Sequence, residues 1–156
     1  MALVGPYFFD TSVLLAGLID LGATARPAQR VFDAIADGRL SKPHTAWHCC
    51  LEFYAVSTRL PEEFRLSPAD CWRLMEEEIL GRFETHQLPK KAGKGLFQAA
   101  VADQTTGGRI YDAHIAEIAR LAGAGTVVTD NRRHFTPLLR HGVRVLSTEE
   151  FATGVG

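Results

Sequence analysis

Short apolar runs alternate along this chain with longer segments of helical periodicity, and this alternation limits the fold more than any other feature. Apolar residues predict strands at 7–9, near Leu40, at 83–88, at 126–129 and at 143–146. Helical spacing predicts helices after Asp10, from 27 to 37, from a Thr45 cap to about Pro61, and over 67–81, 96–102 and 110–121. Strands separated by helices predict an α/β fold, with a central parallel sheet flanked by helices on both faces.

Length and composition set the scale of the molecule. The chain has 156 residues, of which 46% are hydrophobic, so it can bury one substantial core. We expect a single domain over residues 1–156. The formal net charge is −1, which argues against a surface that is basic throughout but leaves room for a local basic patch.

The cysteines and the N-terminus indicate the compartment. Cys49, Cys50 and Cys71 form no CxxC pair, which favours a reduced, cytoplasmic setting. The first nine residues lack a basic region and meet Asp10 at once, so we expect neither a secretion signal nor an anchor. No apolar run approaches the roughly 20 residues that span a bilayer, and we expect no membrane association.

Four acidic residues stand apart because their neighbours are apolar. They are Asp10 after Tyr7-Phe8-Phe9, Glu52 between Leu51 and Phe53, Asp112 between Tyr111 and Ala113, and Asp130 after Val127-Val128-Thr129. Each alone could cap a helix, face solvent or form a turn. Asp10 and Asp130 both follow strands, however, and a parallel sheet brings the ends of its strands to one edge.

Carboxylates that converge in a crevice repel one another unless a cation neutralises them. Oxygen ligands favour Mg²⁺ or Mn²⁺, and the sequence has no Cys/His set at zinc spacing. His44 and His48 are four residues apart without an HExxH pattern, so structural roles are expected for them, and His114 is expected to point away from Asp112. Mg²⁺ among carboxylates can activate water and neutralise a phosphodiester, which points to phosphodiester hydrolysis.

Several strings of the sequence, in this order, resemble PIN domains, most closely the VapC-type toxins of bacterial toxin–antitoxin pairs. They are Phe9-Asp10-Thr11-Ser12-Val13-Leu14, Leu51-Glu52-Phe53, Tyr111-Asp112-Ala113-His114-Ile115-Ala116, Val128-Thr129-Asp130-Asn131 with His134-Phe135, and the closing 145–151. The resemblance implies a PIN-like α/β fold, Mg²⁺ or Mn²⁺ dependence, endonucleolytic cleavage of RNA, inhibition by a cognate antitoxin protein, and a homodimer.

The resemblance places Asp10, Glu52 and Asp112 on acidic positions of the family. The fourth position is open, because Thr129 and Asn131 fit the family's spacing while Asp130 lies one place away. We therefore expect catalytic roles for Asp10, Glu52, Asp112 and Asp130, and metal ligation by Asp10 and Asp112 with Asp130 or Asn131. Substrate contacts are expected from Thr11 and Ser12, which could equally cap a helix, and from Arg132 and Arg133, which could hold RNA phosphates.

Two other functions compete with this interpretation. A phosphatase of the haloacid-dehalogenase type also has an Asp after its first strand, but it needs a second Asp two residues later, where this chain has Ser12. A PIN-like module without turnover could bind RNA or protein. The ambiguity between Asp130 and Asn131 supports that second alternative, and the other three acids argue against it.

Overall fold

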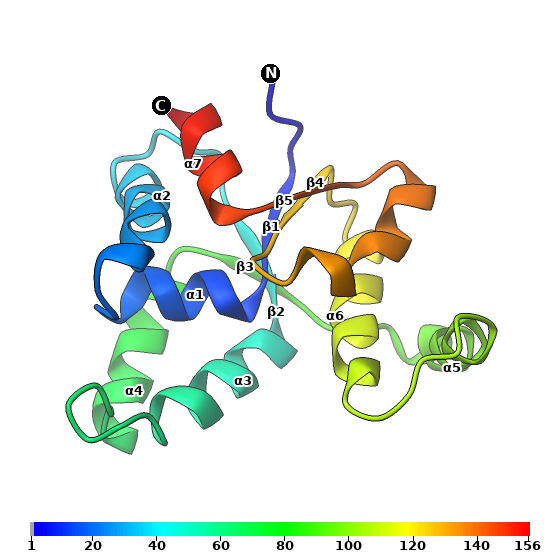
Figure 1. Ribbon diagram of the computed structural model, residues 1–156, viewed down its shortest axis with the longest axis horizontal. Coiled ribbons are helices and arrows are strands. Elements are labelled where there is room, and N and C mark those ends of the chain that lie inside the picture. The colour runs from blue at the N-terminus through cyan, green and yellow to red at the C-terminus, as the bar shows by residue number, and fades with distance from the viewer. Residues whose placement is uncertain (1) are drawn as a thin grey trace.

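The computed structural model describes residues 2–156 and is built on a five-stranded parallel sheet with the order β3-β2-β1-β4-β5 (Figure 1). The strands are β1 Tyr7–Phe9, β2 His44–Ala46, β3 Glu84–His86, β4 Thr126–Val128 and β5 Arg144–Leu146. This arrangement confirms the predicted α/β class and the parallel sheet.

Helices cover both faces of this sheet. They are α1 Thr11–Leu18, α2 Arg26–Ala36, α3 Trp47–Ser57, α4 Pro68–Leu74, α5 Gly93–Ala102, α6 Arg109–Leu121 and α7 Thr148–Val155, and a π-helical segment, Met75–Leu80, continues α4. Figure 1 shows α1, α2 and α7 on one side of the sheet and α6 on the other, with α5 beyond α6. Among residues 2–156 no helix is long and apolar enough to cross a membrane.

The central strands form the core because both of their faces are covered. Phe8, Phe9, Val127 and Val128 have no exposed surface, as expected for continuous apolar runs in a parallel sheet. The ring of Phe9 meets that of Phe151 from α7 in an edge-to-face contact with centroids 5.4 Å apart. The predicted reduced cysteines Cys49, Cys50 and Cys71 are all buried and unpaired.

The region before α3 differs from the sequence-based prediction. No strand forms at Leu40; β2 begins at His44, after Pro43. A proline lacks the N–H that a strand paired on both sides needs, so the ladder starts beyond it. Thr45 is not a helix cap but lies within β2, where its hydroxyl donates to the carbonyl oxygen of Phe9 (2.8 Å).

Candidate active site

Asp10 lies at the junction between β1 and α1, at the carboxyl end of the central strand. Its N–H donates to the Val128 carbonyl (3.1 Å), which extends the pairing of β1 with β4 by one residue. The buried carboxylate caps α1: Oδ1 accepts from the Thr11 N–H (2.6 Å), and Oδ2 accepts from the hydroxyls of Thr129 (2.6 Å) and Ser12 (3.2 Å). Three donors therefore fix this side chain, and the pairing with Val128 fixes its backbone.

Burial raises the pKa of Asp10 to about 6. Hydrogen bonds from Thr129, Thr11 and Ser12 oppose this effect, and the charge of Asp112 adds to it. A buried carboxylate whose ionisation is further disfavoured by a second carboxylate is the setting in which a bound cation relieves the most repulsion.

Glu52 reaches the same region from α3. The Thr11 hydroxyl donates to Glu52 Oε1 (2.6 Å), and His48 Nε2 lies 3.8 Å from Oε2. Burial raises the pKa of Glu52, but the nearby His48 and the hydroxyl of Thr11 together outweigh burial, and the pKa lies below its ordinary value. Thr11 therefore contacts both carboxylates: its N–H donates to Asp10, and its hydroxyl donates to Glu52. Glu52 is ionised at neutral pH.

A histidine pair continues this chain of contacts away from Glu52. His48 Nδ1 lies 2.6 Å from His114 Nδ1, which links α3 to α6. Burial and the neighbouring His48 lower the pKa of His114, which favours the neutral form of His114, and a neutral ring can accept a hydrogen bond from its partner. Sequence reasoning treated His114 as incidental, because nothing local in the sequence signals a partner 66 residues away.

The histidine pair forms part of the wall of a pocket of about 510 Å³ between α3 and α6. Its other walls are mainly apolar, with Trp47, Leu51, Tyr111 and Ile118, and Glu52 lies on its border. Trp47, Leu51 and Tyr111 are all exposed. An apolar, aromatic surface therefore adjoins the acidic residues.

Asp112 lies in the first turn of α6, as the sequence predicts for a residue near a helix N-terminus. His134 Nδ1 lies 2.8 Å from its Oδ2, so the segment that follows β4 holds this carboxylate. Asp112 and Asp10 are close enough for the charge of one to raise the pKa of the other. The sheet thus brings together residues that are about a hundred positions apart.

Asp130 and Asn131 follow β4 and both are exposed. Asp130 Oδ1 accepts from the Thr148 N–H at the start of α7 (3.1 Å), and the Asp130 N–H donates to Ser12 Oγ (3.2 Å). The Asn131 N–H donates to Thr129 Oγ1 (3.0 Å) and so supports the hydroxyl that holds Asp10. One Asp130 oxygen is thus engaged by a helix N-terminus, while Asn131 acts on Asp10 through Thr129.

The two arginines beyond β4 differ in their surroundings. Arg132 pairs with Glu150 (2.6 Å), which is itself part of the capping box of α7. Arg133 is exposed, and within residues 2–156 it has no ion-pair partner. Arg133 is consequently the freer of the two to contact a phosphate.

The side chains fit a hard divalent cation in chemistry and in charge. Asp10, Glu52 and Asp112 present oxygen atoms only, and the pKa of Asp10 is raised by its burial and by the charge of Asp112, which a bound cation would offset. The three carboxylates do not gather as a compact set; across residues 2–156, only His44, Glu84 and His86 place ligand atoms within 4.8 Å of one another. Each carboxylate is held by partners of its own: Asp10 by Thr11, Ser12 and Thr129, Glu52 by Thr11, and Asp112 by His134.

The parallel sheet with helices on both faces is the fold of a PIN domain. The PIN domain family model matches residues 6–133, and the chain belongs to this family. The match spans Asp10, Glu52 and Asp112 together with both candidates for the fourth position.

Known relatives are similar over much of the chain. Ribonuclease VapC40 of Mycobacterium tuberculosis is 28% identical over 123 residues, which is 79% of this chain and 85% of that protein. Ribonuclease VapC27 of the same species is 33% identical over 54% of this chain and 60% of its own. Among solved structures, M. tuberculosis VapC20, described as a sarcin-ricin loop cleaving toxin, has a TM-score of 0.60 at 14% identity and covers 78% of this chain and 86% of its own. The resemblance to VapC-type PIN domains is therefore confirmed.

Proposed function

We propose that this protein is a Mg²⁺-dependent endoribonuclease, with Mn²⁺ as a substitute ion, and the toxin of a VapBC-type pair. The observation that carries the proposal is the buried Asp10, held by Thr129 and Ser12 beside the charge of Asp112. Two similar proteins are named ribonucleases.

Each side chain has a separate task in this proposal. Asp10 and Asp112 would hold the ion, and Asp130 or Asn131 would complete its oxygen ligands. Glu52 is kept ionised by His48 and Thr11, and it is positioned to accept a proton from the attacking water. When bound, the ion would supply positive charge to the phosphodiester oxygen and lower the pKa of water.

RNA would approach from the side of the exposed segment after β4. Arg133 would contact a phosphate directly, whereas Arg132 would first have to leave Glu150. The hydroxyls of Thr11 and Ser12 already donate hydrogen bonds to Glu52 and Asp10. We therefore propose that these two residues position the carboxylates and do not contact the substrate.

Cleavage of a labelled total-RNA pool by the purified protein tests the nuclease. We expect cutting with Mg²⁺ and with Mn²⁺ and none with EDTA, and we expect Asp10→Asn to abolish it. Glu62→Gln is a matched control, because Glu62 is an exposed acid outside the site. Full activity in Asp10→Asn would refute the assignment, and binding without cutting in every metal would favour the RNA-binding module.

The antitoxin and the homodimer are separate parts of the proposal. Exposed apolar side chains on α3, α5 and α6 favour protein contacts: Trp47, Leu51, Phe97, Val101 and Tyr111. We expect the neighbouring open reading frame to encode a small protein that copurifies and suppresses toxicity. If no such protein is found, the toxin assignment is weakened, but the proposed chemistry is unaffected.

The homodimer has its own test: light scattering of the isolated chain measures its mass in solution.

A further inference from the structure

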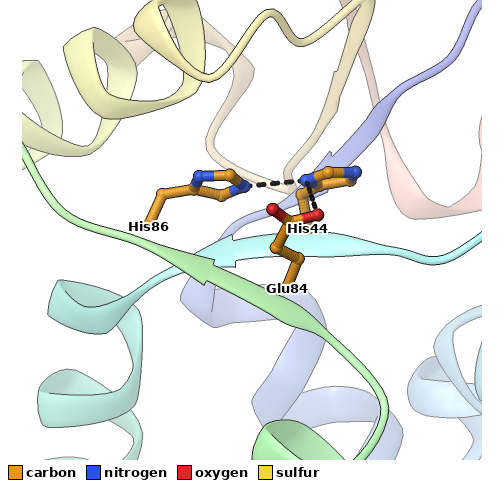
Figure 2. Close-up of side chains that lie close together, drawn as sticks. All are labelled: His44, Glu84 and His86. Carbon is orange, nitrogen blue, oxygen red and sulfur yellow. Dashed lines mark hydrogen bonds and ion pairs between the residues drawn. The ribbon is translucent and has the colours of Figure 1, made fainter.

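A second group of potential ligands lies on strands β2 and β3. Figure 2 shows His44 on β2 and Glu84 and His86 on β3, with all three side chains on the same side of the two strands. Their common face follows from the register, since His44 is opposite Glu84, and residues two apart in a strand share a face. Strand pairing alone therefore brings the three together.

The distances within the group are short. His44 Nδ1 lies 2.8 Å from His86 Nε2 and 3.7 Å from Glu84 Oε2, and all three ligand atoms lie within 4.8 Å of one another. A tetrahedral ion with bonds of about 2.0–2.1 Å separates its ligand atoms by about 3.3–3.4 Å. The two measured distances lie on either side of that value, so small rotations of the rings would suffice to admit an ion.

We propose that His44, Glu84 and His86 form a Zn²⁺ site with three protein ligands. Two imidazoles and one carboxylate are a ligand set that zinc uses, with the fourth position left to water. Nitrogen ligands also separate this site from the all-oxygen site at Asp10, since Mg²⁺ prefers oxygen. The protein would thus hold two different ions at two places.

The group lies near the surface of the molecule, with the His44 side chain 16% exposed. The carboxylate side chain is about half exposed (53%), so an ion can reach the group from solvent.

The position of the group indicates a structural role for the ion. β3 is an edge strand that pairs only with β2, through three residues. The two residues that follow it, Gln87 and Leu88, line the pocket between α3 and α6. An ion that joins β2 to β3 would hold this edge of the sheet, and with it one wall of the pocket, in place.

Calorimetric titration of tag-free, EDTA-treated protein with ZnCl₂ tests the proposal without any measurement of nuclease activity. We expect one saturable equivalent that Mg²⁺ does not displace, and a higher melting temperature once it is bound. Glu84→Gln and His86→Gln should weaken the affinity by about tenfold or more, since loss of even an outer partner of a metal ligand costs about 10–100-fold. His141→Asn, at an exposed histidine, should leave it unchanged.

The competing explanation is that the two rings only share a hydrogen bond. Absence of saturable binding would establish that explanation and overturn the proposal. Binding that survives in Glu84→Gln and His86→Gln but is lost in His48→Asn would also overturn it, because the ion would then sit at the His48–His114 pair. Circular dichroism of each metal-free variant separates a lost ligand from a lost fold, since Glu84 is about half exposed and its variant should fold normally.

Discussion

Asp10 is the central residue of the candidate site, and its surroundings have opposite effects on its ionisation. Burial raises its pKa to about 6, while three hydrogen-bond donors are directed at its oxygens. Donors directed at a carboxylate favour its ionised form, whereas burial favours the protonated form. The two effects therefore oppose each other at Asp10. Without a cation, this conflict should appear as a pH-dependent loss of stability.

The sign of that loss follows from the raised pKa. Between pH 3.8 and about 6 the folded, metal-free chain keeps a proton on Asp10 that the unfolded chain has released. Stability therefore falls as pH rises through this window, by roughly 3 kcal/mol for this one group. Urea unfolding of wild type and Asp10→Asn in EDTA, at pH 4 and at pH 7.5, measures this change in the free energy of unfolding. Between the two pH values, wild type should lose roughly 2–3 kcal/mol more than the variant. An equal loss in both proteins would contradict the assignment.

Thr129 offers a test of how Asp10 is kept ionised. A hydrogen bond to a charged group contributes about 1.5–3 kcal/mol, so Thr129→Val should raise the pKa of Asp10. Stabilisation of the fold by Mn²⁺, followed by melting temperature, should then begin about one pH unit higher than in wild type. Thr126→Val is the matched control: it removes a buried hydroxyl three residues earlier, in β4, where the partner is the Val4 carbonyl. A shift of the same size in both variants would disprove a specific effect on Asp10.

At the scale of elements, local sequence predicts most of the helices and the strands that carry the acids. β1 and β4 are short apolar runs followed at once by polar residues, and the Ser67 cap before Pro68 starts α4 as predicted. β2 was misplaced because its own residues, His44 to Ala46, lack an apolar strand pattern. Its pairing with β1 and β3 determines it, and pairing between distant segments is not visible in local periodicity.

The packing of α1 on α2 gives a prediction at this scale. A Cβ at Gly17 would lie 2.2 Å from the ring of Phe32, so Gly17→Ala should destabilise the fold by about 1–3 kcal/mol. The same change at Gly95 in α5 meets open space and should stabilise it by about 0.5–1 kcal/mol. Urea denaturation of both variants compares one substitution in two environments. A stable Gly17→Ala protein would mean that α1 and α2 pack less closely than described.

For the whole molecule, the parallel sheet decides which distant residues meet. The meeting of Asp10 with the segment after β4 at one edge could be predicted, because strand ends in such sheets converge. Asp112 comes from the N-terminus of α6, and no strand end places it. The contacts that tune the acids could not be predicted: Thr11 with Glu52, His134 with Asp112, and His48 with His114 join different helices and segments. Which side chains of two different elements meet depends on how those elements pack, and local sequence patterns do not predict that packing.

RNA cleavage by wild type and Asp112→Asn over a series of Mg²⁺ and Mn²⁺ concentrations tests the central claim most directly. If these carboxylates hold the ion that drives cleavage, the variant should lose about 10²-fold or more in rate at every metal concentration. Glu62→Gln should follow the wild-type curve. Cleavage by wild type that persists in EDTA, or an Asp112→Asn variant as active as wild type, would contradict the account.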